Sequence, residues 1–98
     1  MANALVRLSN EYSASDFEKA MGYGIKGLEL SKKIGFIKGI AQSYNNIGVT
    51  YYFHGKYSQA LESYLKSLKI NEKAGNLKGI SDCYNNIGAV NYEQGDYP

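Results

Sequence analysis

Apolar side chains recur along the chain at the three- and four-residue spacing of an amphipathic helix. Between residues 57 and 68 they fall at i, i+3, i+4, i+7, i+8 and i+11, which places them in one stripe. The preceding segment has the same pattern, so the two stretches predict two helices. Their apolar positions are Ile40, Tyr44, Ile47, Gly48 and Tyr51, then Tyr57, Ala60, Leu61, Tyr64, Leu65 and Leu68.

Glycines interrupt the helical pattern at regular places. Gly35 and Gly75 stand where a helix is expected to end in a left-handed cap, and Gly55 and Gly95 where two helices turn tightly. No stretch alternates like a strand, and the chain is predicted to be all-α. The helices are expected near residues 2–13, 16–33, 37–54, 57–73 and 77–94.

The helical pattern is part of an internal repeat. Tyr44-Asn45-Asn46-Ile47-Gly48 recurs as Tyr84-Asn85-Asn86-Ile87-Gly88, an offset of 84 − 44 = 40 residues. A first copy fits the same register more weakly, with Ala20 against Ala60. The sequence therefore predicts a single domain over 1–98, with a degenerate repeat at 1–34, a complete repeat at 35–74 and a half repeat at 75–98.

The Tyr44-x-x-Ile47-Gly48-x-x-Tyr51 segment, with Ala60 and Tyr64 on the next helix, resembles the tetratricopeptide repeat. The 40-residue period exceeds the usual 34 and is similar to the long variants of kinesin light chains, spindle-orientation adaptors and bacterial regulators and sensor kinases. This resemblance implies antiparallel helix pairs stacked as a right-handed α-solenoid. Three positions depart from the pattern, namely Leu8 in place of glycine, Asn91 in place of tyrosine, and Pro98 after Tyr97; we therefore expect a fragment of a longer array.

The resemblance also implies a concave groove that binds a protein partner, either as a peptide or as a helix. The weak first copy would add Leu5, Ser9 and Tyr12. None of the implied positions is Lys or Arg, so we expect no recognition of a partner's C-terminal carboxylate. The implied groove residues of the second and third repeats are Gln42, Asn45, Val49, Tyr52, Phe53, Asp82, Asn85, Ala89, Tyr92 and Glu93.

The paired asparagines are unusual because asparagine is a mediocre helix former. One hypothesis is that Asn46 and Asn86 satisfy polar groups between neighbouring helices. A second hypothesis is that Asn45 and Asn85 face the groove and bind a peptide backbone. The two hypotheses concern different residues, and both can hold.

One short motif suggests a different function. Gly22, Gly24 and Gly27 spell the G-x-G-x-x-G of a dinucleotide-binding loop. Such a loop needs a strand before it and a βαβ unit around it, and neither is predicted. We interpret these glycines as helix residues, with Gly24 and Gly27 facing inward for close packing.

Candidate catalytic chemistry is sparse. The chain has one histidine, His54, and one cysteine, Cys83, and both are predicted to be structural; we expect neither an enzyme nor a metal or other cofactor. The net charge is +2, with basic residues scattered, so no nucleic-acid or membrane partner is expected. With a single cysteine and no secretory signal pattern, we expect a cytoplasmic protein.

Two functions from different classes follow from these observations. The first is a non-catalytic scaffold that binds a protein partner in its groove. The alternative is a self-associating structural or regulatory segment of a larger bacterial signalling protein, with Ile80, Tyr84 and Ile87 uncovered on the last helix. This alternative includes a homodimer or an exchange of helices between chains.

Overall fold

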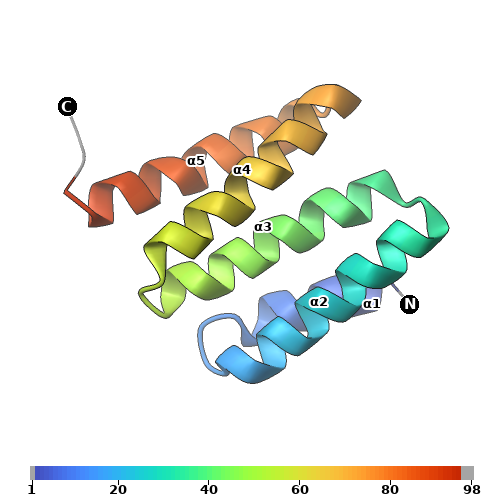
Figure 1. The fold of residues 1–98 in the computed structure, drawn as a ribbon, viewed down its shortest axis with the longest axis horizontal. Helices are drawn as coiled ribbons and strands as arrows, with labels where there is room; N and C mark the ends of the chain where they lie inside the picture. Colours follow the sequence, from blue (N-terminus) through green and yellow to red (C-terminus); the bar gives the residue numbers. More distant parts are fainter. Residues whose placement is uncertain (1, 96–98) are drawn as a thin grey trace.

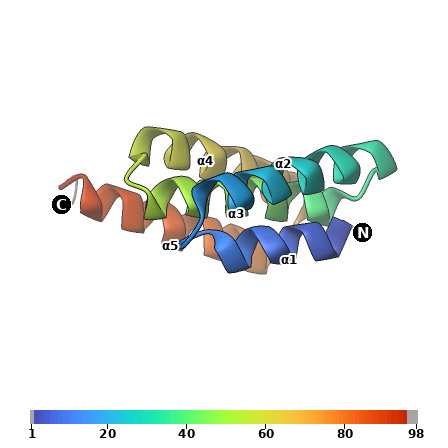
Figure 2. The same cartoon turned by 90° about the horizontal axis from the view of Figure 1, so that it is seen from below.

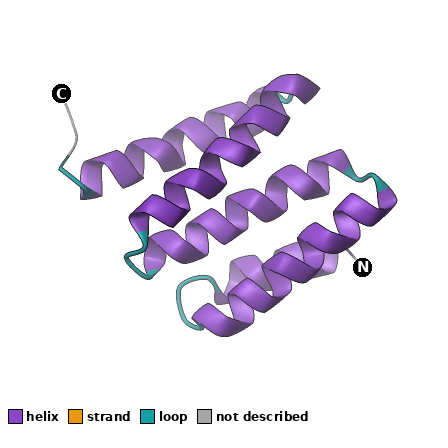
Figure 3. Cartoon of the chain, viewed as in Figure 1, coloured by secondary structure: helices purple, strands orange, loops and turns teal. Residues whose placement is uncertain are grey.

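The computed structural model describes residues 2–95 and contains five α-helices within that range (Figures 1 and 3). The final residues of the predicted third repeat, 96–98, including the Tyr97-Pro98 departure, lie outside the described residues. Each observed helix begins and ends within one residue of its predicted bounds. The helices are α1 (Ala2–Tyr12), α2 (Phe17–Ile34), α3 (Ile37–Phe53), α4 (Tyr57–Ala74) and α5 (Leu77–Glu93).

Glycines in the left-handed conformation close the helices where the sequence predicted them. Their φ angles are 69° at Gly35, 75° at Gly55, 70° at Gly75 and 73° at Gly95. A residue with a Cβ is strained at such angles. The cap amides of Gly35 and Gly75 donate to carbonyls of the last helical turn, as expected for glycine caps.

Successive helices run antiparallel and form a stack of hairpins (Figure 1). Figure 2 shows α2 and α4 together on one side of the molecule and α1 and α5 on the other, with α3 between them. The described chain measures 41 × 32 × 16 Å. The fold is therefore a flat, all-α array, consistent with the predicted repeat architecture.

The best-packed part of the core lies where α3, α4 and α5 meet. Ala60, Tyr64 and Val90 are buried there. An ideal Cβ built on Gly48 would lie 2.6 Å from Cε1 of Tyr64 and 3.2 Å from the Ala60 carbonyl. Glycine at position 48 thus lets α3 approach α4 closely enough for the Tyr64 ring to pack against its backbone.

The α1–α2 hairpin is built in a shifted register. Ser9 contacts the Ala20 carbonyl as Gly48 approaches the Ala60 carbonyl, but the spacing is 20 − 9 = 11 residues in the first pair and 60 − 48 = 12 in the second. Ser9, not Leu8, therefore takes the place of Gly48, an offset of 48 − 9 = 39 residues. Ser9 is fully buried and its hydroxyl donates to the Ala20 carbonyl at 2.9 Å. The expected Leu8 departure is therefore wrong, because the span from this contact to α2 is one residue shorter than its counterpart and places a small residue at the close approach.

The three glycines of the G-x-G-x-x-G spelling lie inside α2, and no strand precedes them in the described range. Gly24 and Gly27 are buried. A Cβ on Gly24 would lie 2.9 Å from Cγ1 of Ile47, so this glycine permits close packing of α2 on α3. The interpretation of all three as helix residues, with Gly24 and Gly27 facing inward for close packing, is confirmed.

Candidate functional site

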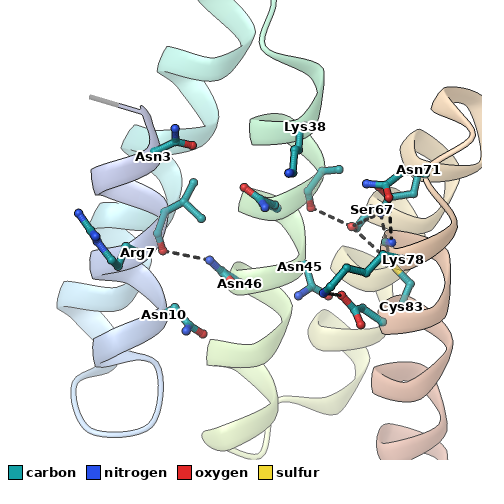
Figure 4. Close-up of a pocket in the computed structure, with 16 residues that line it drawn as sticks. Asn3, Arg7, Asn10, Lys38, Asn45, Asn46, Ser67, Asn71, Lys78 and Cys83 are labelled. Carbon is teal, nitrogen blue, oxygen red and sulfur yellow. Dashed lines mark hydrogen bonds and ion pairs between the residues drawn. The ribbon is translucent and has the colours of Figure 1, made fainter.

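A groove of about 520 Å³ runs between α1, α3 and α5, and α4 forms its floor (Figure 4). Most of its lining is polar, and asparagine contributes six side chains. The groove is lined by Asn3, Val6, Arg7 and Asn10 from α1, Lys38, Ala41, Gln42, Asn45 and Asn46 from α3, Ser67 and Asn71 from α4, and Asn76, Lys78, Gly79, Asp82 and Cys83 from the start of α5.

The structure brings three of the predicted groove residues into this lining, namely Gln42, Asn45 and Asp82. Asn85 is exposed but lies outside the lining, and its side chain makes no hydrogen bond within residues 2–95. Ala89 is half-buried outside the lining, and Val49 packs against the Ala60–Tyr64–Val90 core. The predicted set is therefore divided between the groove and neighbouring surfaces.

Four other predicted residues gather at the carboxyl ends of α3 and α5. Tyr52 and Phe53 have their ring centroids 5.7 Å apart, and the Tyr52 hydroxyl donates to Oε1 of Glu93 at 3.5 Å. Phe53 is 55% exposed and Tyr92 68%. We call Tyr52, Phe53, Tyr92 and Glu93 the aromatic end.

Desolvation raises the pKa of Tyr52, and the nearby charges of Glu93 and Tyr57 raise it further. The Tyr52 hydroxyl therefore stays protonated at neutral pH and acts as a donor. This donor links α3 to α5 at the aromatic end.

The residues expected from the first copy do not face the groove. Leu5 lies beside Gly27, Ser9 bonds the Ala20 carbonyl, and the Tyr12 ring stacks on Tyr23 with centroids 5.9 Å apart. All three contacts are to α2, so the expectation for α1 is wrong. The 39-residue register explains the error, since it matches Asn3 with Gln42, Val6 with Asn45 and Asn10 with Val49, and those three α1 residues do line the groove.

Asparagine amides tie the groove-forming helices to one another. Asn46 Nδ2 donates to the Val6 carbonyl at 3.0 Å and so joins α3 to α1. Asn86 Nδ2 donates to Oδ1 of Asn45 at 2.8 Å and joins α5 to α3. The hypothesis that Asn46 and Asn86 satisfy polar groups between helices is confirmed. Asn45 has one amide oxygen engaged in this tie and is therefore only partly available to a ligand.

The comparisons with known proteins agree with this architecture. Residues 39–98 match the family model described as tetratricopeptide repeat. The chain belongs to the tetratricopeptide repeat family. Repeats of this family generally mediate protein–protein interaction and are typically non-catalytic scaffolds. No curated protein matches the chain.

The tetratricopeptide groove also contains cations that the sequence interpretation missed. Arg7, Lys38 and Lys78 all line it, so the expectation of a groove without Lys or Arg is wrong. In the 39-residue register Arg7 matches Asn46, which was not one of the predicted groove positions. Lys38 and Lys78 occupy the second position of α3 and α5, before the first groove position that the family pattern supplied.

The floor of the groove holds a buried polar cluster from α4 and α5. Ser67 donates to the Ala41 carbonyl at 2.8 Å, the Cys83 thiol donates to the Ser67 hydroxyl at 3.3 Å, and Asn71 contacts both side chains. Cys83 is fully buried, as predicted for a packed structural residue. This cluster anchors the start of α5 on α4 and fixes the depth of the groove.

His54 ends α3 and has a structural contact to the α1–α2 connection. Its Nε2 lies 3.1 Å from the Ser13 carbonyl, and its ring meets the Phe17 ring edge-on at 5.1 Å. Within residues 2–95, no cluster of three His, Cys, Asp or Glu side chains could hold a metal ion. None of the helices described there combines the length and hydropathy needed to cross a membrane.

Proposed function

We propose that this tetratricopeptide domain is a scaffold that binds a segment of a partner protein in the groove between α1, α3 and α5. The observation that carries the proposal is the groove itself, a cavity of about 520 Å³ lined by amide side chains of three parallel helices. Amides both donate and accept, and so they suit the backbone of an extended peptide. The exposed rings of the aromatic end offer apolar contacts beyond it.

A random-peptide phage library panned against the chain tests this proposal. We expect enriched peptides whose binding, measured by fluorescence anisotropy with labelled synthetic copies, is lost in a Gln42→Ala/Asn45→Ala/Tyr52→Ala variant. A matched double variant, Ile25→Ala/Leu65→Ala, removes exposed apolar side chains outside the groove lining and should bind normally. Far-ultraviolet circular dichroism checks that each variant is folded. Enriched peptides that bind the Gln42→Ala/Asn45→Ala/Tyr52→Ala variant as tightly as the wild type would contradict the proposal.

A second candidate function is self-association through α5. Among residues 2–95, nothing covers the face of α5 that corresponds to the α4-covered face of α3, since Tyr84 is 55% exposed and a Cβ on Gly88 would meet nothing within 4 Å. Repeats bury such faces against neighbours, which favours a second copy as the occupant. In this function the chain would serve as a regulatory segment of a larger signalling protein.

Light scattering over a concentration series tests self-association. We expect a mass above 10.8 kDa that falls to the monomer value in a Tyr84→Glu variant. Gln59→Glu adds the same charge at an exposed position of α4 and should leave the mass unchanged. A wild-type mass of 10.8 kDa at every concentration would contradict this second function.

A further inference from the structure

We propose that the deep part of the groove, between the first turns of α3 and α5, binds a carboxylate carried by an aspartate or glutamate side chain of the partner peptide. This inference rests on the proposed scaffold function and specifies the chemistry of its ligand. Three independent features support it, namely the charge of the groove, the cost of its lysines to the helices, and the neutral donor beside Lys78.

The charge of the groove favours an anion. Its lining contains three cations, Arg7, Lys38 and Lys78, and one carboxylate, Asp82, for a net charge of 3 − 1 = +2. The whole chain also carries +2, from 11 basic and 9 acidic residues. The rest of the molecule is therefore balanced, and the excess positive charge is concentrated where a ligand would lie.

The two lysines stand where they destabilise their own helices. Lys38 and Lys78 are the second residues of α3 and α5, and neither helix has an acidic residue in its first turn. A cation near a helix amino terminus opposes the macrodipole and costs about 0.3–1 kcal/mol. By contrast α2 begins with Asp16 and Glu18, the favourable arrangement. Helix stability thus does not explain a lysine at the same position of both repeats, whereas an anionic ligand does.

The lysines remain available to a ligand. Within residues 2–95, Lys38 takes part in no ion pair, because the position four residues later is Gln42 and not an acid. Lys78 contacts Asp82 at 3.1 Å, but the two side chains are 87% and 50% exposed. An exposed pair with the cation on the amino-terminal side is worth only a few tenths of a kcal/mol. A ligand carboxylate can therefore compete with Asp82.

A neutral donor lies beside Lys78 (Figure 4). Asn86 occupies the Asn45 amide oxygen, which leaves the Asn45 nitrogen to donate into the groove. In Figure 4 the Lys78 side chain extends from α5 toward Asn45. The residue before α3, Phe36, caps none of that helix's first amides with its side chain. Arg7 points away from α3 in the same view. It therefore adds to the positive electrostatic potential of the groove but is not one of the residues proposed to contact the carboxylate.

An apolar surface lies farther along α3 from the lysines. Phe53 is exposed and its ring packs on Tyr52 near the carboxyl end of that helix, so a peptide seated at the lysines has apolar side chains to contact in that direction. The expected ligand is thus an extended segment with an acidic residue in the deep part and an apolar residue near Tyr52 and Phe53.

Peptides enriched from the phage library provide the probes for this inference. We expect them to contain Asp or Glu, and we expect Kd of the tightest synthetic peptide to rise at least about tenfold in Lys38→Gln/Lys78→Gln, as for loss of a charge-assisted hydrogen bond. The matched control Lys26→Gln/Lys69→Gln removes the same charge from exposed positions outside the lining, and Kd should change less than about twofold. Replacing the peptide's acid by its amide should abolish the difference between the variants.

The outcomes separate this inference from the scaffold function. Enriched peptides that depend on Gln42, Asn45 and Tyr52 but lack acids, or that bind the Lys38→Gln/Lys78→Gln variant normally, would overturn the inference and leave the scaffold function standing. Loss of binding on C-terminal amidation alone would also overturn it in favour of a terminal carboxylate. If no peptide is enriched, both the scaffold function and the inference fail.

Discussion

Gly48 on α3 lies directly against the ring of Tyr64 on α4. A Cβ at position 48 would be 2.6 Å from Cε1 and 2.7 Å from Cδ1 of that buried ring. We expect Gly48→Ala to lower the free energy of unfolding by about 1–3 kcal/mol, because overpacking outweighs the gain in helix propensity. Urea denaturation followed by circular dichroism measures the change.

Gly88 provides the matched control, since it holds the same repeat position on α5 but no atom of the described residues lies within 4 Å of a Cβ built there. Gly88→Ala should raise the free energy of unfolding by up to about 1 kcal/mol through helix propensity. Equal effects of the two substitutions would show that the Tyr64 contact does not limit position 48.

Ser43 and Ser67 are buried serines with opposite expected effects. The Ser43 hydroxyl has no hydrogen-bond partner among residues 2–95, whereas that of Ser67 donates to the Ala41 carbonyl. An unpaired buried hydroxyl costs about 1–3 kcal/mol. Ser43→Ala should therefore stabilise the fold by about 1 kcal/mol, and Ser67→Ala should destabilise it by about the same amount. Thermal denaturation of both variants checks the sign, and destabilisation by Ser43→Ala would contradict the prediction.

The α2 helix is expected to be the least stable element of its size. Like α4 it is 18 residues long, but it contains three interior glycines, each costing about 1 kcal/mol of helix stability relative to alanine. Amide hydrogen exchange should be faster in α2 than in α4. Gly22→Ala meets nothing within 4 Å and should slow exchange throughout α2. Equal protection of the two helices in the wild type would refute this prediction.

The buried Tyr64 hydroxyl links stability to alkaline pH. Burial raises the pKa of Tyr64 well above its usual value of 10.0. Above pH 10 the unfolded chain loses this proton while the folded chain retains it, so the free energy of unfolding falls as pH rises. Below pH 10 this contribution is fully present. In Tyr64→Phe the fall above pH 10 should be shallower, while below pH 10 the wild type and variant should follow parallel curves. Urea denaturation across this range measures both slopes.

The helices could be predicted from the sequence because glycine marks their ends. Gly35, Gly55 and Gly75 must adopt left-handed angles that other residues avoid, so the interruptions are readable in the sequence. The close packing at Gly24 and the ties made by Asn46 and Asn86 were also predictable, because an unfavourable helix residue at a repeated or interior position needs a reason in packing.

The orientation of α1 could not be predicted in the same way. Its connection to α2, residues 13–16, contains no glycine to mark the end of the helix, so the span between Ser9 and Ala20, one residue shorter than its counterpart, was not visible. A shift of one residue turns α1 by about 100°, the rotation between successive helix positions. It brings Asn3 and Asn10 to the groove and takes Ser9 into the interior. The groove cations at Lys38 and Lys78 were missed because they belong to helix starts, where the family pattern supplied no binding position.

The two asparagine ties have different mechanical properties. Asn46 donates to a backbone carbonyl, so only the Asn46 side chain can rotate to follow a change in the spacing of α1 and α3. Asn86 donates to another side chain, so both Asn86 and Asn45 can rotate about their single bonds. The joint between α3 and α5 therefore has more freedom to change curvature with its hydrogen bond intact than the joint between α1 and α3. In this groove the first hairpin is the more rigid wall and α5 the more adjustable one.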